Sequence, residues 1–339
     1  MRAAFTSTLL ASLVFAQPAV QAPPERWVLV YSGGPYHPRY SADDLSRLLA
    51  AVDTTGRPTG PLCTAVVLTE FEALSGRFYM PWPNGAPATG ADWDQYIDSL
   101  VSPAGPLVRL DSAVARAGVF GERRLPVAIM VPFPNRRADT LRFAGRTFTM
   151  ASETDRAASV TAYMETIVAR VQPLRLPNLT ISAFYWLNEG VADADTSLVA
   201  RAAAASHRLN MRFLWIPSWG APNATRWRDL GFDDAWQQPN YFFHPDIPAA
   251  RLDSAVDRAR GAAMGLELEF DRRLFSDAKF ADRLGPYLAA MESAPDLRRR
   301  SIAIYEGAGG LIDLSRRADA ASRALYARLV AVLQGETSP

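Results

Sequence analysis

The chain has 339 residues, of which 49% are hydrophobic and 21% charged, with a net charge of +1 at pH 7. This composition supports a large buried core and excludes disorder, while near-zero charge gives none of the positive field that nucleic-acid binding requires. One cysteine, three scattered histidines and a single lysine, Lys279, argue against internal disulfides, histidine zinc sites, and Schiff-base or P-loop chemistry.

The first 22 residues predict a signal peptide. Arg2 gives a positive start, residues 3–16 form an apolar run, and Val20-Gln21-Ala22 resembles a small-residue cleavage site. The run is shorter than the roughly 18 apolar residues needed to span a bilayer, and no later stretch reaches that length. We expect export to the periplasm or beyond, with residues 23–339 as one mature domain; retention as an uncleaved anchor is the alternative.

The remaining chain alternates short apolar runs with amphipathic stretches. Strands are predicted at Trp27–Tyr31, Ala65–Thr69, Val127–Val131, Ile181–Leu187, Phe213–Ile216, Ala235–Gln237, Leu266–Phe270 and Ile302–Tyr305. Helices are predicted at Ala42–Val52, Asp94–Ala117, Ala157–Val171, Ser197–Leu209, Ala249–Ala263, Ala278–Met291 and Arg316–Leu333, with a shorter one at Ala224–Leu230.

Eight strands with helical crossovers predict an α/β fold, a single (β/α)8 TIM barrel. An open doubly wound sheet is the competing fold, but Ser32-Gly33-Gly34-Pro35 lacks the glycine spacing of its phosphate-binding turn.

Two long connections follow the second and third strands, on the face where barrel enzymes keep their active sites. The first, Glu72 to Leu125, carries Phe78-Tyr79-Met80-Pro81-Trp82-Pro83-Asn84-Gly85, and the second, Pro134 to Ala157, predicts a hairpin at Leu141–Phe148. Trp82 is expected either to form a sugar platform above the cleft or to belong to a hydrophobic plug.

Carboxylates gather at the ends of strands four and seven. Asn188-Glu189 follows strand four, and the period of two along strand seven turns Glu267, Glu269 and Asp271 inward. Acidic groups inside a barrel are costly unless they are paired or functional. Two alternatives to catalysis are a structural network with Arg and Tyr, and a divalent cation held by these three carboxylates.

Opposed carboxylates on strands four and seven are the arrangement of retaining glycosidases on this fold. We expect Glu189 to be the general acid/base and Glu269 the nucleophile or base, with Glu267 one layer deeper as an orienting group. Tyr241 falls where a large clan of barrel glycosidases keeps a tyrosine beside its nucleophile. This comparison rests on analogy between folds. Because the carboxylate separation is unknown, the sequence leaves retention or inversion open.

Aromatic residues near the strand ends suit the apolar faces of sugar rings. The expected substrate-binding residues are Tyr31, Glu70, Trp82, Trp186, Asn188, Trp215, Trp219, Gln238, Asn240, Tyr241, Glu267, Asp271 and Tyr305. Glu70 and Glu72 are expected either to bind substrate or to pair with arginines. His37 is expected to be a surface-loop histidine.

Five segments occur in an order that resembles a known family: Val30-Tyr31-Ser32-Gly33, Phe184–Leu187, Trp215-Ile216-Pro217, Gln238–Phe243 and Gly265–Asp271. They resemble the bacterial family called domain of unknown function 4855. The resemblance implies an exported bacterial protein, often in polysaccharide-degrading settings, with a glycosidase-like barrel. The family commonly has histidine where this chain has Asn188. This weakens the match of Asn188-Glu189 to the Asn-Glu pair that ends strand four in the large clan of barrel glycosidases, and it leaves Glu189 as the better candidate.

The sequence therefore predicts an exported glycoside hydrolase that acts on a poly- or oligosaccharide as a monomer, with no cofactor, no metal and no nucleic-acid partner. The alternative is a non-catalytic glycan-binding barrel, which needs the same aromatic cleft but no matched acid and base.

Overall fold

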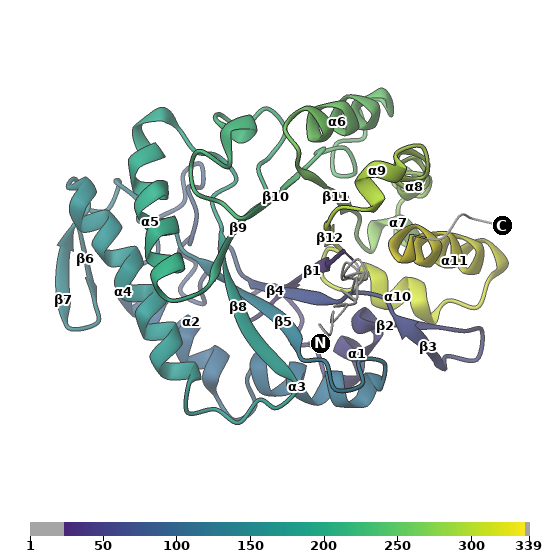
Figure 1. The fold of residues 1–339 in the computed structure, drawn as a ribbon, viewed down its shortest axis with the longest axis horizontal. Coiled ribbons are helices and arrows are strands. Elements are labelled where there is room, and N and C mark those ends of the chain that lie inside the picture. The colour runs from purple at the N-terminus through teal and green to yellow at the C-terminus, as the bar shows by residue number, and fades with distance from the viewer. Residues whose placement is uncertain (1–23, 336–339) are drawn as a thin grey trace, which may run out of the picture.

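The structure is a computed structural model that describes residues 24–335. Eight parallel strands close into a barrel, in which the last strand pairs with the first (Figure 1). They are β1 (Arg26–Tyr31), β4 (Ala65–Thr69), β5 (Leu125–Val131), β8 (Leu179–Trp186), β9 (Arg212–Trp215), β10 (Asp234–Gln237), β11 (Gly265–Glu269) and β12 (Ile302–Tyr305). The predicted (β/α)8 barrel is confirmed, and the open sheet is wrong. The predicted signal peptide, residues 1–22, lies outside the described residues.

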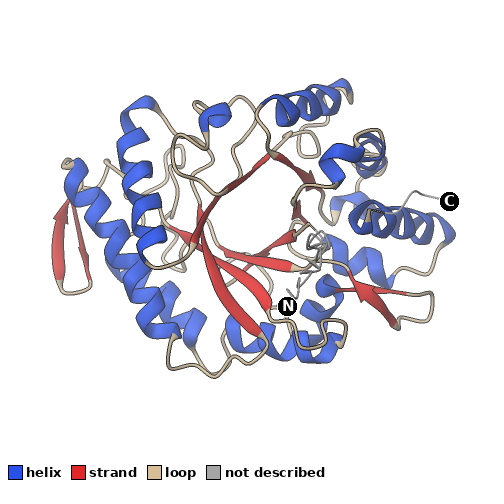
Figure 2. Ribbon diagram, in the orientation of Figure 1, coloured by secondary structure: helices blue, strands red, loops and turns tan. Residues whose placement is uncertain are grey.

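Helices surround the ring of strands (Figure 2). They are α1 (Ala42–Leu49), α2 (Gly90–Val101), α3 (Pro106–Ala117), α4 (Glu153–Val171), α5 (Thr196–Arg208), α6 (Ala250–Gly261), α7 (Arg273–Ser276), α8 (Leu284–Glu292), α9 (Pro295–Arg298), α10 (Gly310–Arg316) and α11 (Ala320–Gln334). Two 3-10 turns, η1 (Asp193–Asp195) and η2 (Ala224–Arg226), complete the crossovers.

Local sequence explains where several helices begin. Ser41 and Asp44 form a capping box at α1, and Thr89 and Asp92 form another at α2, so backbone N–H groups at both helix starts have partners. The helix predicted at 94–117 is two helices, because Gly105 is the N-cap of α3 and Pro106 occupies its first position.

Three further helix predictions need correction. Residues 50–52 were predicted to end the first helix, but they form β2 (Ala50–Val52) and pair with β3 (Pro58–Pro61), joined by a turn in which Gly56 has a φ of 83°. The helix predicted at 278–291 begins at Leu284. The one predicted at 316–333 begins at Ala320, where the Asp319 side chain caps α11.

The predicted hairpin at 141–148 is confirmed as β6 (Thr140–Phe143) and β7 (Arg146–Thr149). It lies at the periphery beside α4 (Figure 1). Phe143 packs against Trp93 of α2 and Tyr163 of α4, with ring centroids 5.5 and 6.1 Å away. The hairpin therefore covers the outside of two helices.

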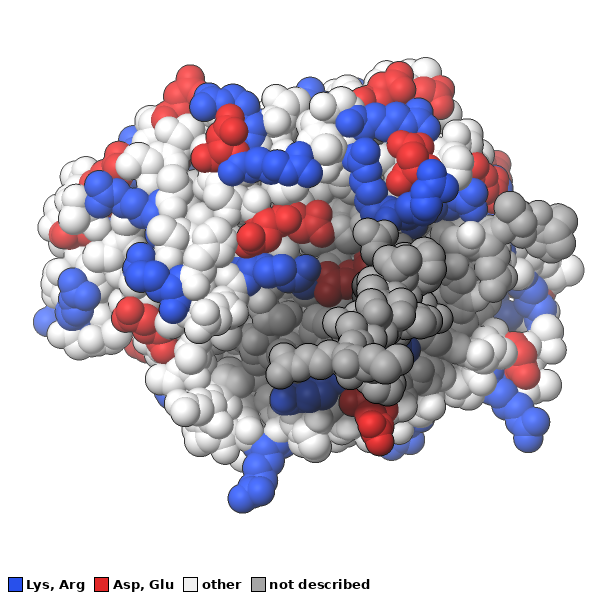
Figure 3. Space-filling model, in the orientation of Figure 1, with Lys and Arg blue, Asp and Glu red and all other residues white. Residues whose placement is uncertain are grey.

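The described surface mixes the two signs of charge. On the face that Figure 3 shows, Lys and Arg side chains lie beside Asp and Glu side chains. Within residues 24–335, no helix has both the length and the apolar character needed to cross a bilayer.

Candidate active site

A cavity of about 370 Å³ lies at the carboxyl ends of the barrel strands. Seven of the residues that line it were expected from the sequence: Tyr31, Trp82, Glu189, Gln238, Asn240, Glu267 and Tyr305. The others are Leu29, Thr69, Phe71, Met80, Tyr185, Leu187, Ile216 and Phe243. Carboxyl, amide and phenol groups thus meet aromatic rings in one space.

Strand alternation decides which aromatic residues of β8 reach this cavity. Tyr185, Leu187 and Glu189 line it at alternate positions, so Trp186 faces the other way. The Trp186 ring is fully buried between Phe133 and Phe213. Sequence reasoning selected Trp186 and missed Tyr185, although the same alternation that selects Glu189 would have found it.

The same parity applies after β9, where Ile216 lines the cavity and Trp215 is buried behind it. Trp215 stacks on Phe232 and donates its indole N–H to the carbonyl of Asn188 at 2.9 Å. Trp219 packs beneath the guanidinium of Arg251 and is not among the lining residues. Trp215 therefore supports the end of β8 from behind.

Glu189 and Glu267 are the two carboxyl groups in the cavity wall. Glu189 is half-buried, whereas Glu267 has no exposed surface. Burial raises the pKa of Glu189 to about 7, and the Gln238 side chain opposes that rise. Burial, followed by the charges of Glu269 and Glu189, raises the pKa of Glu267 well above its ordinary value, again opposed by Gln238. The Gln238 amide therefore acts on both carboxyl groups.

Glu269 belongs to the same electrostatic cluster but does not line the cavity. Its Oε2 accepts hydrogen bonds from the hydroxyl of Tyr287 on α8 and from the backbone N–H of Tyr241, the latter at 3.4 Å. Burial raises its pKa to about 7 against these donors. Tyr241 thus reaches the strand-seven carboxylate, as expected, but it does so through its backbone, while its ring packs under Arg283.

Asp271 and Asn188 are turned to other partners. Asp271 forms an ion pair with Arg273 at 2.8 Å, and the Asn188 amide donates to the Gly190 carbonyl at 2.6 Å. Glu267, Glu269 and Asp271 therefore do not converge on one point. Among residues 24–335, no group of three or more His, Cys, Asp or Glu side chains could hold a metal ion.

A second cluster borders the cavity at the ends of β1 and β4. The buried Glu70 carboxylate accepts from the Gly34 N–H at 2.6 Å and the Phe71 N–H at 3.0 Å, and contacts His37 Nδ1 at 2.9 Å. His37 stacks on Tyr31 with ring centroids 3.5 Å apart, and the Tyr31 and Tyr305 hydroxyls are 2.7 Å apart. His37 is 12% exposed, so the expectation of an ordinary surface histidine is wrong.

Of the two long connections, only the first contributes lining residues. Trp82 is 45% exposed, lines the cavity, and stacks on Phe78 with centroids 5.4 Å apart. Its carbonyl accepts from Arg137 at 3.1 Å. The loop thus holds an exposed indole ring at the cavity edge.

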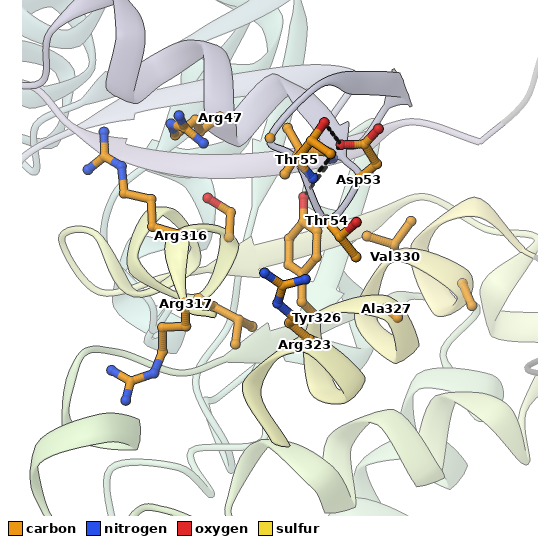
Figure 4. A pocket seen from close by; sticks show the side chains of 15 residues that line it. Arg47, Asp53, Thr54, Thr55, Arg316, Arg317, Arg323, Tyr326, Ala327 and Val330 are labelled. Atoms are coloured by element: carbon orange, nitrogen blue, oxygen red, sulfur yellow. Dashed lines mark hydrogen bonds between the residues drawn. The ribbon is translucent and has the colours of Figure 1, made fainter. Parts of the chain in front are cut away.

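A larger cavity, of about 630 Å³, lies away from the strand ends, between the β2–β3 turn, α10 and α11 (Figure 4). Its one acidic lining residue, Asp53, is held by the Thr55 hydroxyl and N–H. Arg316 pairs with Asp44, and Arg317 pairs with Asp319. This cavity offers no carboxyl pair for acid–base chemistry, and we place the candidate active site at the strand ends.

Comparison with known proteins gives a family. A family model described as "Domain of unknown function (DUF4855)" matches residues 26–331, and no curated protein matches the sequence. Similar solved structures include the spore cortex-lytic enzyme SleL of Bacillus megaterium QM B1551, at 10% identity, TM-score 0.45, and coverage of 95% of this chain and 79% of that one. The GH18 chitinase ChiB of Flavobacterium johnsoniae has 11% identity, TM-score 0.42, and coverage of 91% and 94%. A tryptophan synthase alpha-subunit from Pyrococcus furiosus has 10% identity, TM-score 0.38, and coverage of 92% and 98%. Likenesses at this level concern the barrel fold and not its chemistry.

Proposed function

This chain belongs to the DUF4855 family, whose description assigns no activity, and on that premise we propose that it is a glycoside hydrolase acting on an oligo- or polysaccharide. The observation that carries the proposal is that Glu189 and Glu267, from strands four and seven of the barrel, line one cavity together with aromatic rings. Paired carboxyl groups flanking a sugar are the machinery of this reaction.

The cluster supplies both protonation states that hydrolysis needs. The charge of Glu189 raises the pKa of both Glu267 and Glu269, and the charge of Glu269 raises the pKa of Glu267, so near neutral pH the group holds a proton and a negative charge together. We assign the proton donor's role to Glu189 on its position, because it has the most exposed carboxyl of the three, and its pKa of about 7 lets it take up and release a proton near neutral pH.

Glu267 takes the second role. The sequence favoured Glu269 as the nucleophile or base. We assign this role to Glu267 instead, because Glu267 lines the cavity and Glu269 does not. A poorly solvated carboxylate is a strong base and nucleophile, and it would stabilise positive charge developing at the anomeric carbon. The negative charge of Glu269, which is fixed by Tyr287 and the Tyr241 backbone, raises the pKa of Glu267 and so would make Glu267 a stronger base.

In the proposed step, Glu189 protonates the glycosidic oxygen as the bond from that oxygen to the anomeric carbon breaks. One water supplies the new hydroxyl at the anomeric carbon, and its other proton passes to a carboxylate. Either water attacks directly with Glu267 as base, or Glu267 first forms an ester that water then cleaves. Both routes consume one water, and proton NMR of the first-formed anomer distinguishes them.

The test is product release from a panel of bacterial and plant polysaccharides, read by mass spectrometry. Glu189→Gln and Glu267→Gln should each lose at least about 100-fold in turnover. The matched control is Glu165→Gln, a change of an exposed carboxyl on α4 that should leave turnover intact. Equal product release from the wild type and both cavity variants would overturn the assignment.

A non-catalytic glycan-binding barrel is the second candidate, and the complete burial of Glu267 and Glu269 favours it. In that case the wild type would bind oligosaccharides at the cavity while releasing no product from any glycan. Export is part of the proposal, since a polysaccharide outside the cell needs an exported enzyme; N-terminal sequencing of the protein recovered from culture fractions tests it.

A further inference from the structure

A third cavity, of about 390 Å³, lies beside the candidate active site and shares Tyr31 with it. It is bounded by the segment after β1, by α2, and by the connection from α2 to α3. A glycan seated over the strand ends would therefore meet this cavity one side chain away, across Tyr31.

Two arginines line this third cavity, and neither has an acidic partner. Arg39 is exposed and Arg109 is half-buried, and no carboxylate of residues 24–335 lies within ion-pair distance of either guanidinium. Arg109 donates one N–H to the Ala104 carbonyl, but its buried Nε has no hydrogen-bond partner. The acidic residue in this lining, Asp98, is paired with Arg170 at 2.6 Å.

The two guanidinium groups also repel each other. The pKa of Arg109 is lowered, first by burial and then by the positive charge of Arg39. A half-buried guanidinium beside a like charge, as Arg109 is, is stabilised when a ligand supplies the opposite charge. Guanidinium groups bind carboxylate and sulfate oxygens through paired, charge-assisted hydrogen bonds.

Polar groups complete the lining. Ser99 and Gln95 of α2 offer a hydroxyl and an amide beside the arginines. Gly33, with a φ of 146°, lets the segment after β1 come close to α2, since a Cβ there would lie 3.3 Å from the Ser99 hydroxyl. Such a wall suits a charged sugar with its hydroxyl groups better than an apolar ligand.

We propose that this cavity is a subsite for an anionic group on the glycan, a uronic-acid carboxylate or a sulfate ester, carried by the sugar ring beyond Tyr31. The inference rests on the proposed glycosidase function and adds the substrate class: an acidic polysaccharide. Arg39 and Arg109 bind the anion, while Glu189 and Glu267 act on the neighbouring linkage.

The experiment compares three oligosaccharides of equal length: a neutral one, one containing a uronic acid and one carrying a sulfate ester. For wild type, Arg39→Gln, Arg109→Gln and the control Arg201→Gln, an exposed arginine on α5, KM and kcat are measured with each. Either arginine variant of the third cavity should raise KM for one acidic substrate about tenfold, with a much smaller change in kcat. The KM for the neutral substrate should stay unchanged. The acidic substrate that shows the effect identifies the anion.

Binding is measured separately by calorimetry in the Glu267→Gln background, so that the two proposals can fail independently. Arg-dependent binding of an acidic oligosaccharide, with no turnover by wild type, retains the subsite and overturns the hydrolase. If the wild type turns over glycans but the arginine variants change KM equally for acidic and neutral substrates, the subsite is overturned. The subsite is also overturned if the wild type shows no preference for acidic over neutral oligosaccharides. Absence of any Arg-dependent binding does the same. Because Arg39 is exposed, its variant reports on binding even if Arg109→Gln unfolds.

Discussion

Two groups of buried carboxylates lie at the same end of this barrel, and they differ in what surrounds them. Glu70 and Glu306, after β4 and β12, are anchored by several donors each: Glu306 accepts from the Tyr40 hydroxyl and from the N–H groups of Gly309 and Leu311. The other group is Glu189, Glu267 and Glu269, at the ends of β8 and β11. In this group, neither oxygen of Glu267 has a well-aligned hydrogen bond to any of residues 24–335.

Burial alone therefore does not mark an active site in this barrel. Burial raises the pKa of Glu306 to about 8 although donors surround it, and raises the pKa of Glu189 to about 7 at the cavity. What separates the groups is position: Glu189 and Glu267 line the strand-end cavity, and Glu306 does not. A structural carboxylate uses its lone pairs within the protein, whereas a catalytic one keeps them for the substrate.

The largest expected effect is that one carboxyl-to-amide change lowers activity and the other lowers stability. Glu267→Gln should lose about 10³-fold in kcat, roughly 4 kcal/mol, while its free energy of unfolding stays level or rises by about 1 kcal/mol, because folding no longer buries an acidic group whose pKa burial raises. Glu70→Gln should instead lower the free energy of unfolding by about 1 to 3 kcal/mol, because an amide N–H₂ would face N–H donors. Kinetics and urea denaturation measure both. A destabilised Glu267→Gln would erase the distinction between the groups.

The next effect is on the pH dependence of stability. A carboxyl whose pKa is higher folded than unfolded binds more protons in the native state, so stability falls as pH rises from the unfolded value toward the folded one. For Glu306 that window runs from the ordinary value of 4.5 to about 8. Glu306→Gln should therefore reduce the downward slope by about 1 kcal/mol per pH unit, measured by urea denaturation from pH 5 to 8. An unchanged slope would contradict the raised pKa.

A smaller effect tests how tightly Glu70 is anchored. A Cβ on Gly34 would lie 2.3 Å from the Glu70 carboxyl carbon, so Gly34→Ala should cost about 2 kcal/mol of stability. The double variant with Glu70→Ala should lose less than the sum of the two single changes, because the clash is removed. Simple additivity in thermal melts would show that the contact does not carry the cost.

The smallest expected effect lies at the cavity edge. Trp82→Ala should weaken binding of long oligosaccharides by about 1 kcal/mol without lowering the melting temperature, because the exposed ring serves as a sugar platform. Tyr36→Ala is the control, since Tyr36 is 78% exposed but does not line the cavity. If Trp82→Ala melts several degrees lower and binds normally, the loop is packing.

The sequence by itself determined the barrel. Short apolar runs separated by amphipathic stretches can bury both faces only as parallel strands under helices, and all eight predicted runs became barrel strands. Period-two alternation likewise brought Glu267 to the cavity. Applied to the end of β8, the same rule would have replaced Trp186 with Tyr185.

Only the tertiary structure decided which inward carboxylate lines the cavity. Glu267 and Glu269 have the same parity on one strand, yet Glu269 is held by Tyr287 of α8 and the backbone after β10, contacts that strand periodicity does not encode. The same holds for His37 with Glu70, 33 residues apart, and for Arg39 with Arg109 in one cavity. Local pattern sets the direction of a side chain, because it follows backbone geometry; its partners are set by how distant segments pack.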